Sequence, residues 1–240
     1  MKPQHATFLH GFTQTGASWA PVLDLVSSPL VSACPDAPGH GNNPDGKRSL
    51  SQYASDIATT MEPGILVGYS MGARMALHVA LEYPSLVSAL ILISGKPGLR
   101  TETERAARRN SDNDLADHIE KIGTKTFIDE WLALPMFSGL NSTTNGRAER
   151  LTNAANGLAD SLRYAGTGTQ LSLWDEITQL QIPVYLITGE RDEKFTDIAR
   201  QMNDVIPSST LNVVPAVGHT AHLENPPITA SLLNKIISQQ

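Results

Sequence analysis

Ser70 lies in the pattern G-x-S-x-G, which spans Gly68 to Gly72. An apolar strand pattern at residues 65–69 leads into this serine, and a helical pattern at residues 71–82 follows it. A nucleophilic serine on such a strand-to-helix turn has a strained backbone, so its close neighbours must be small. Unpaired N–H groups at the start of the helix can stabilise a developing oxyanion. We therefore predict that Ser70 is catalytic and that the Met71 amide forms one side of an oxyanion hole.

A catalytic serine needs a base and an acid that orients the base, and both follow later predicted strands. Asp192 comes after one strand in the run Gly-Glu-Arg-Asp, and His219 comes after the last strand, directly behind a glycine. Active-site residues of open α/β sheets collect at these carboxyl ends. The order Ser, Asp, His predicts that His219 takes the serine proton and that Asp192 fixes its tautomer. His222 remains the alternative base, and Glu190 and Asp197 remain the alternative acids.

The second oxyanion-hole donor is predicted in the loop after the first strand, where His10-Gly11-Phe12 stands. The Phe12 amide would point at the oxyanion, and Gly11 would let the backbone approach the substrate closely. His10 is interpreted as structural. Asp36 and His40, which follow the second strand in a Pro- and Gly-rich turn, are interpreted as holding that turn by hydrogen bonds.

The elements that must position these residues alternate between strands and helices. Apolar runs rich in β-branched residues predict strands at residues 6–10, 30–34, 65–69, 89–94, 184–189 and 211–215. Helical patterns lie between them, at residues 18–26, 50–61, 71–82, 196–206 and 227–238. This alternation predicts an α/β fold whose mainly parallel sheet is flanked by helices.

The alternation stops in the middle of the chain. Between residues 95 and 172 only helical patterns occur, at residues 113–122, 124–134, 146–155 and 158–165. We therefore predict a core made of residues 1–95 and 173–240, and a helical lid made of residues 96–172. The lid carries equal numbers of basic and acidic residues, so the net charge of −6 resides in the core. A less acidic lid could face an anionic ligand, although solvated helix faces explain the same charges.

Composition excludes several classes of protein. The chain has 240 residues, of which 40% are hydrophobic and 18% charged, enough for a sizeable core. No apolar run has the length of a membrane span, and an acidic chain lacks the basic face of a nucleic-acid binder. Cys34 is the single cysteine, which excludes an internal disulfide and fits a reducing compartment. Met1-Lys2-Pro3-Gln4 starts no apolar leader, so a cytoplasmic protein is expected. The oligomeric state does not follow from the sequence.

Over nearly its full length the chain resembles the α/β-hydrolase superfamily, with the strands that usually precede the His-Gly strand absent or shortened. Within that superfamily it is most similar to the 2-succinyl-6-hydroxy-2,4-cyclohexadiene-1-carboxylate synthases of menaquinone biosynthesis. The arginine one turn after Ser70 and the Asp-x-Lys-Phe run are the most discriminating features, and Ala73 stands where a second glycine is common. The matching segments are residues 9–13, 68–74, 135–138 with Trp131, 157–162, 189–195 and 218–226.

The resemblance implies a lyase that removes a proton from a small polyanionic substrate and expels pyruvate, without a cofactor or a metal. It implies substrate contacts by Tyr69, by the cations Arg74 and Lys194 and, from the lid, by Arg150, Trp131 and Phe137. Arg74 lies four residues after Ser70 and so on the same helix face. A surface salt bridge for Arg74 and a solvated loop charge for Lys194 remain the alternatives. The sequence holds no phosphate-binding glycine loop and no dinucleotide motif.

Two other classes stay open. A carboxylesterase or a carbon–carbon bond hydrolase would use the same triad on a neutral or singly charged substrate, and it would have no use for Arg74 and Lys194 together. A non-catalytic binding protein on this fold would be expected to lack a triad member, whereas all three are present here.

Overall fold

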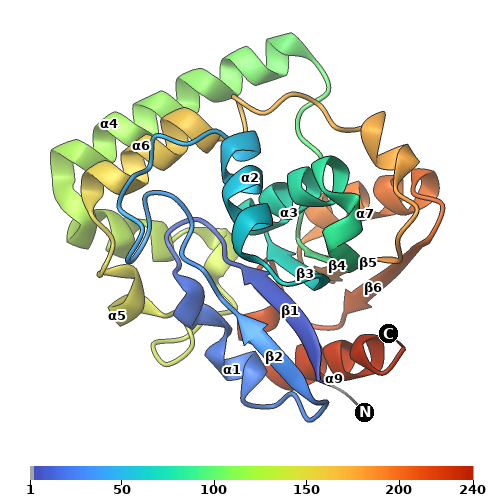
Figure 1. Cartoon of the computed structure of the whole chain (residues 1–240). Helices are drawn as coiled ribbons and strands as arrows, with labels where there is room; N and C mark the ends of the chain where they lie inside the picture. The colour runs from blue at the N-terminus through green and yellow to red at the C-terminus, as the bar shows by residue number, and fades with distance from the viewer. Residues whose placement is uncertain (1–2, 240) are drawn as a thin grey trace.

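The computed structural model describes residues 3–239, and a six-stranded parallel sheet forms its centre (Figure 1). All six predicted strands are present, in the order β2-β1-β3-β4-β5-β6. The predicted α/β architecture, a mainly parallel sheet flanked by helices, is therefore confirmed. The strands are β1 (Gln4–Leu9), β2 (Leu30–Ala33), β3 (Gly64–Tyr69), β4 (Val87–Ile93), β5 (Val184–Gly189) and β6 (Ser209–Val214).

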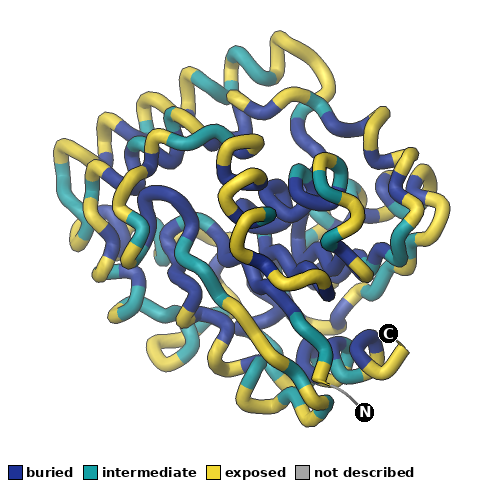
Figure 2. Tube along the Cα trace, in the orientation of Figure 1, coloured by how far each residue is buried: buried dark blue, intermediate teal, exposed yellow. Residues whose placement is uncertain are grey.

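Burial explains the composition of these strands. Every residue of β3 is buried, and β4 is buried at all but one position, which is why both are continuous apolar runs (Figure 2). β2 lies at an edge of the sheet and is half-buried or exposed. Because all strands run parallel, their carboxyl ends meet at one edge, where Ser70, Asp192 and His219 follow β3, β5 and β6.

Helices cover both faces of the sheet, as predicted. One face packs against α2 (Leu50–Thr60), α3 (Met71–Glu82) and α7 (Glu193–Val205), and the other against α1 (Ala20–Leu23), α8 (Ala221–Glu224) and α9 (Pro226–Ile237) (Figure 1). Short 3-10 turns at Gly16–Trp19, Pro84–Leu86, Pro135–Phe137 and Glu176–Gln179 complete the connections. The sequence patterns missed α8 and three of these turns because each is too short to show a helical period.

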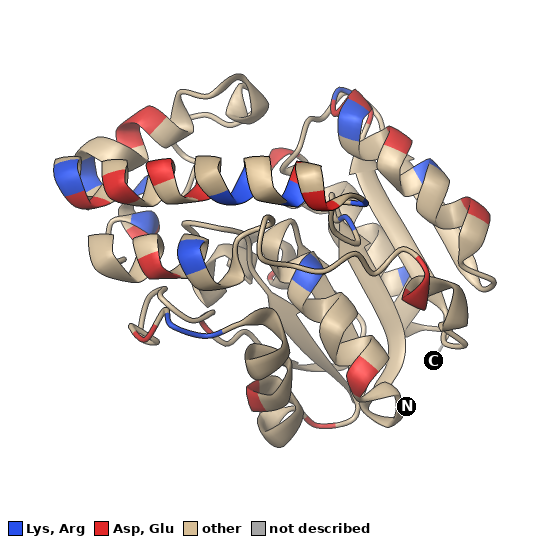
Figure 3. Cartoon of the chain, turned by 90° about the horizontal axis from the view of Figure 1, so that it is seen from above, with Lys and Arg blue, Asp and Glu red and all other residues tan. Residues whose placement is uncertain are grey.

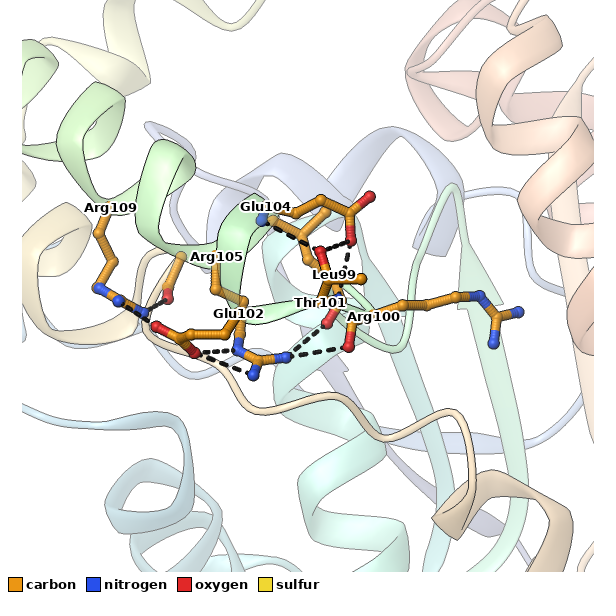
Figure 4. A network of polar contacts seen from close by, with 8 residues as sticks. Leu99, Arg100, Thr101, Glu102, Glu104, Arg105 and Arg109 are labelled. Carbon is orange, nitrogen blue, oxygen red and sulfur yellow. Dashed lines mark hydrogen bonds and ion pairs between the residues drawn. The ribbon is translucent and has the colours of Figure 1, made fainter.

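The first lid helix begins earlier than predicted. The sequence pattern placed its start at residue 113, whereas α4 spans Glu102–Leu132. A capping box fixes the true start, because the Thr101 amide donates to the Glu104 carboxylate and the Glu104 amide donates back to the Thr101 hydroxyl (Figure 4). Glu102 also pairs with Arg105 and Arg109, so the first turns are stabilised by charges rather than by an apolar stripe. Gly123, with φ 77° and ψ 161°, breaks α4 between the two predicted helices.

The two remaining lid helices differ from the prediction in opposite directions, since the first is shorter and the second begins earlier than expected. The expected helix at residues 146–155 is reduced to α5 (Arg147–Arg150), and α6 spans Ala155–Ala165. α4 and α6 lie side by side (Figure 1) and share a small apolar core with Phe12 of the sheet edge. Among residues 3–239 no strand lies between β4 and β5. The division into core and lid remains a prediction.

Residues 3–239 contain neither a helix that could cross a membrane nor a cluster of metal-ligating side chains. No helix between residues 3 and 239 has the length and apolar character needed to cross a bilayer. In the same residues, no three His, Cys, Asp or Glu side chains gather as metal ligands would. The expectation that the first four residues start no leader falls in part on Met1 and Lys2, which lie outside the described residues.

Candidate active site

Ser70 stands on a strained turn between β3 and α3, with φ 51° and ψ −103°. Neighbouring backbone crowds this turn. A Cβ on Gly72 would lie 2.1 Å from the Leu9 carbonyl oxygen, and a Cβ on Gly68 would lie 2.4 Å from the Gly72 carbonyl oxygen. Only glycine fits at both positions, and this is the physical reason for the G-x-S-x-G pattern. The turn leaves the serine partly exposed at the carboxyl edge of the sheet.

His219 joins Ser70 to Asp192 by hydrogen bonds. Its Nδ1 lies 2.6 Å from Asp192 Oδ2, and its Nε2 lies 3.1 Å from Ser70 Oγ. The carboxylate can only accept, so Nδ1 carries the proton and Nε2 accepts from the serine hydroxyl. Asp192 also caps α7 through the Phe195 amide, which fixes the carboxylate in place. His219 is only 3% exposed, so these contacts lie in a largely water-free environment.

The structure places the alternative base and acids elsewhere. His222 is buried beneath Tyr69 and Trp19, with ring centroids 4.2 Å and 4.8 Å away, and neither ring nitrogen has a hydrogen-bond partner in the described part of the chain. Burial lowers the pKa of His222 to about 3. Glu190 accepts a hydrogen bond from the Ala216 amide, and Asp197 pairs with an exposed arginine on α7. Within residues 3–239 none of the three is hydrogen-bonded to the His219 ring, whose side-chain partners are Asp192 and Ser70.

Two buried histidines support the loop that carries Phe12. His10 Nε2 accepts from the Ala37 amide, and His40 Nε2 accepts from the Thr13 amide. Both rings donate from Nδ1 to nearby carbonyl oxygens, which fixes them as neutral tautomers. Burial lowers the pKa of His10 to about 4 and that of His40 to about 3, so both rings stay neutral at pH 7. They act on the loop by hydrogen bonding, as the sequence interpretation holds.

Phe12 and Met71, which belong to different elements, line the same cavity as Ser70. Within residues 3–239 the Phe12 amide donates no hydrogen bond, and the Met71 amide opens α3, where the first N–H groups have no carbonyl one turn earlier. Asp36, the other polar residue singled out nearby, accepts from the amides of Gly16 and Asn42 and so holds its own turn.

The lid holds the Phe12 loop through two polar side chains. Arg150, which is buried, donates to the Phe12 carbonyl oxygen and to the Thr13 hydroxyl. Asn153 donates to the Thr13 carbonyl oxygen at 2.7 Å and accepts from the Gly41 amide at 2.8 Å. Thr13 itself has a φ of 69°, so these contacts hold a strained residue beside the oxyanion hole. The structure gives Arg150 a place behind this loop, on a separate small cavity, rather than on the cavity that contains Ser70.

A cavity of about 270 Å³ opens above Ser70 and His219. Phe12, Met71 and Trp131 form apolar walls of this cavity. Phe137 and Tyr69, which were predicted to contact the substrate, do not line it. Phe137 packs behind Trp131, with ring centroids 5.7 Å apart, and Tyr69 is buried, with its ring centroid 5.5 Å from that of His219.

Four cations line the same cavity: Arg74, Lys96, Arg108 and Lys194. Arg74 is 6% exposed and donates only to the Gln170 side-chain oxygen, at 3.3 Å. Burial and the charge of Arg108 lower the pKa of Arg74 to about 10, so the guanidinium is charged at pH 7 without a carboxylate partner among the described residues. The sequence predictions of Arg74 and Lys194 thus fall on the cavity wall.

Sequence reasoning missed Lys96 and Arg108. Lys96 follows β4 at the carboxyl edge of the sheet, and this position could have identified it as a candidate site residue. Arg108 lies on α4 and pairs with Asp112, as an ordinary solvated helix residue would. Only the docking of the lid brings its side chain to the cavity, so no pattern in the sequence could have distinguished it.

Comparison with known proteins places the chain among relatives of one kind. A sequence profile described as "Alpha/beta hydrolase family" matches residues 8–232. A Bacillus subtilis protein named "Putative 2-succinyl-6-hydroxy-2,4-cyclohexadiene-1-carboxylate synthase" is 40% identical, over 96% of this chain and 88% of that protein. The 2-succinyl-6-hydroxy-2,4-cyclohexadiene-1-carboxylate synthase of an Enterobacter species is 30% identical, over 96% of this chain and 90% of that one.

Solved structures give the same architecture. "Structure of MenH from S. aureus" superposes with a TM-score of 0.90 at 27% identity, covering 100% of this chain and 95% of that chain. A thermophilic esterase from Thermogutta terrifontis superposes with a TM-score of 0.85 at 19% identity, covering 99% and 90%. At that identity the esterase shares the fold alone.

Proposed function

Since the chain belongs to the alpha/beta hydrolase family, we propose from that premise that it is a carbon–oxygen lyase, a 2-succinyl-6-hydroxy-2,4-cyclohexadiene-1-carboxylate synthase. Its substrate is 2-succinyl-5-enolpyruvyl-6-hydroxy-3-cyclohexene-1-carboxylate, called the precursor from here on. The relatives that carry this name cover nearly the whole chain, and MenH from S. aureus shares its architecture. The enzyme acts in menaquinone biosynthesis.

The observation that carries the proposal is the charge of the cavity wall. Arg74, Lys96, Arg108 and Lys194 surround the space above Ser70, and Asp112 is bound to Arg108. The precursor carries three carboxylates, on the ring, the succinyl group and the enolpyruvyl group. Such a trianion needs several cations in a partly desolvated site, and planar guanidinium groups pair with carboxylates through two parallel hydrogen bonds.

The substrate and product names define the bonds that change. A proton leaves ring carbon 2, the ring double bond moves from carbons 3 and 4 to carbons 2 and 3, and a new double bond forms between carbons 4 and 5. The bond between carbon 5 and oxygen breaks, and the enolate of pyruvate leaves with the bonding electron pair and takes up one proton on carbon to give pyruvate. No water is consumed. The proton at carbon 2 is acidic because it lies next to the succinyl ketone.

The triad supplies the base for this elimination. Ser70 Oγ takes the proton from carbon 2 as its own proton passes to His219 Nε2, and Asp192 stabilises the imidazolium that forms. Negative charge develops on the succinyl ketone oxygen, and the amides of Phe12 and Met71 are the donors that we assign to it. A preorganised oxyanion hole is worth about 3–4 kcal/mol per donor in the enzymes where it has been removed.

Four remaining site residues take indirect roles. Trp131 closes the cavity as an apolar wall with Phe137 behind it, and Arg150 positions the Phe12 loop from the lid. Tyr69 supports the floor beneath His219. We propose no cofactor. We propose the cytoplasm as the compartment, supported by the single cysteine.

A carboxylesterase or carbon–carbon bond hydrolase is the alternative, and the solved esterase of the same fold is the reason to test it. The hydrolase would form an acyl-enzyme on Ser70 and would consume water. The cationic wall argues against it, because a neutral ester gains nothing from Arg74 and Lys96. A non-catalytic binding protein is disfavoured by the complete hydrogen-bonded triad.

Incubation of the purified protein with the precursor tests the proposal. We expect one pyruvate per precursor consumed, measured with lactate dehydrogenase, and diene absorbance that appears at the same rate. We expect p-nitrophenyl esters to turn over poorly, with no burst, because the elimination leaves no acyl-enzyme. Rapid ester turnover with a burst of one equivalent per active site, and no pyruvate from the precursor, would instead establish the hydrolase.

A further inference from the structure

Lys96 is held rigidly at the carboxyl edge of the sheet. It lies three residues after β4, between two anchored neighbours. On one side the Ser94 hydroxyl donates to the His219 carbonyl oxygen at 2.8 Å, and on the other the Leu173 amide donates to the Pro97 carbonyl oxygen at 2.7 Å. Ser94, two residues before Lys96, is therefore bound to the segment that carries His219.

The Lys96 side chain is buried at the cavity without a protein partner. The residue is 8% exposed and lines the cavity together with Ser70. Across residues 3–239, its ammonium makes neither a hydrogen bond nor an ion pair with any side chain or carbonyl group. A buried charge without a partner costs free energy, so its retention in a cavity points to a ligand that supplies the partner.

Every charged group around Lys96 is cationic except one. Arg74 faces it from α3, Arg108 from α4 and Lys194 from the start of α7. The exception is Asp112 on α4, and its carboxylate is already occupied by Arg108 at 2.7 Å and by the Gly168 amide at 3.2 Å. The described residues therefore leave Lys96 no free carboxylate, and an anion that enters the cavity would supply one.

We propose that Lys96 binds one carboxylate of the substrate and that it takes up a proton from solvent when the carboxylate binds. The inference rests on the proposed function, because the precursor brings three carboxylates and Arg74 can pair with only one. Lys96 is thereby a specificity-determining residue that separates a trianionic substrate from a monoanionic one.

The proton uptake follows from the state of Lys96 in the empty cavity. Burial, helped by the charges of Arg108, Arg74 and Lys194, lowers the pKa of Lys96 to about 7. Above pH 7 an increasing share of Lys96 is neutral, and a bound carboxylate favours the ammonium form. The substrate KM therefore rises with pH. If only the ammonium form binds, KM rises roughly 10- to 30-fold between pH 6.5 and pH 8.5.

Three variants test this in steady-state kinetics with the precursor. At pH 6.5 we expect Lys96→Met to raise KM roughly 10- to 100-fold and to leave kcat within about threefold, as for loss of a charged hydrogen bond. At pH 8.5 the KM of Lys96→Met approaches that of the wild type, because the wild-type lysine has lost its proton. Lys96→Arg keeps its charge and has a flatter KM profile than the wild type. Lys121→Met removes an exposed lysine from α4 and serves as the matched control.

The pH dependence separates binding from a structural role. A purely structural lysine would give the same KM ratio at both pH values, and that result, or a ratio below threefold at pH 6.5, overturns the proposal. Thermal unfolding checks the fold of each variant. Lys96→Met should be at least as stable as the wild type at pH 6.5, because it removes a buried ammonium that has no partner.

A binding experiment keeps the proposal separate from the proposed function. Tricarballylate carries three carboxylates and has no group to eliminate, so calorimetry in two buffers of different ionisation enthalpy measures proton uptake without turnover. We expect uptake of about half a proton or more at pH 7.5 in the wild type and none in Lys96→Arg. Uptake without pyruvate formation from the precursor would overturn the proposed function and retain the Lys96 site. Pyruvate formation from the precursor, together with equal proton uptake in the wild type and in Lys96→Arg, would support the proposed function and overturn the Lys96 site.

Discussion

Two histidines three residues apart have different environments. His219 bridges Ser70 and Asp192, whereas His222 is enclosed by aromatic rings and has no polar partner among the described residues. Both follow the same glycine turn, so the sequence left both open as the base. Hydrogen bonding decides between them, because a base must reach the proton it takes and be oriented by an acid.

Alanine variants at the two histidines should therefore fail in different ways. We expect His219→Ala, Ser70→Ala and Asp192→Asn each to lower kcat by roughly 10²- to 10⁴-fold with the fold intact. In double variants the loss in kcat should be much smaller than the product of the two single losses, because the triad acts as a unit. We expect His222→Ala to keep kcat within about tenfold but to lose about 2–4 kcal/mol of stability, since it leaves a buried void. Pyruvate release and urea unfolding measure the two effects. The opposite pattern would make His222 the base.

Arg74 provides a second test of a single residue. Its guanidinium is buried on the cavity wall one helical turn after Ser70, and within the described chain its one hydrogen bond goes to Gln170. Truncating a desolvated carboxylate partner costs about 2–5 kcal/mol, so Arg74→Ala should lower kcat/KM on the precursor by roughly 30-fold to several thousand-fold. Arg74→Lys should recover part of that loss, because an ammonium lacks the bidentate geometry.

The control for Arg74 is Arg100→Ala, which removes an exposed arginine that stacks on Trp174 away from the cavity. We expect this variant to stay within threefold of the wild type in kcat/KM. A loss below threefold for Arg74→Ala would contradict the carboxylate-binding role and would favour the hydrolase alternative.

At the scale of elements, the lid and the oxyanion-hole loop form one unit. Asn153, just before α6, bonds to the Thr13 carbonyl oxygen in the loop after β1 and to the Gly41 amide in the loop after β2. It is buried, so its loss leaves two buried groups without partners. Thr13 is strained and adjacent to Phe12, so any relaxation there moves the oxyanion-hole amide.

Asn153→Ala should thus affect stability and turnover together. We expect a loss of about 2–3 kcal/mol in the free energy of unfolding, and a fall in kcat that exceeds the change in KM. Urea unfolding and steady-state pyruvate release provide the measurements. Asn156→Ala, an exposed neighbour in α6, is the matched control and should change neither. If the two variants behave alike, the lid does not position the loop.

Elements and site residues differed in how far the sequence predicted them. The buried strands β3 and β4 were predictable because a buried parallel strand is a continuous apolar run, and the hydrogen-bonded triad because each member lies within five residues of the carboxyl end of a strand. The start of α4 was not predictable, because the stretch that Thr101 and Glu104 cap has no apolar stripe. The roles of Arg108 and Arg150 could not be read from patterns, because the way the lid docks determines which side chains reach the cavity.

At the scale of the whole molecule, charge is separated between surface and cavity. The chain has a net charge of −6, and basic and acidic residues are interspersed along α4 (Figure 3). The cavity wall, in contrast, gathers four cations. A cationic cleft in an acidic molecule concentrates field lines at its mouth and attracts a polyanion locally. The net charge of −6 alone would have predicted that the protein repels a polyanionic substrate.

The buried histidines make the stability of the whole molecule depend on acid. His10, His40 and His222 are neutral in the fold, with pKa values lowered by burial to about 4, 3 and 3. In the unfolded chain a histidine has a pKa of about 6.5, so below that pH the unfolded state binds protons that the folded state does not. The contribution of these neutral histidines to the free energy of unfolding is therefore fully present above pH 6.5. It decreases as the pH falls below that value.

Each such histidine lowers the free energy of unfolding by up to about 1.4 kcal/mol per pH unit, so the three together give about 4 kcal/mol per pH unit below pH 6. Urea unfolding at pH 7.0, 6.0 and 5.0 should show this steepening loss. His222→Phe removes one titrating ring and should make the slope shallower by about a third, since phenylalanine also fits an apolar aromatic site. A free energy of unfolding that stays constant from pH 6.5 to 5.0 would mean that these rings are protonated in the fold, and the neutral hydrogen-bonding roles of His10 and His40 in holding the Phe12 loop would then be wrong.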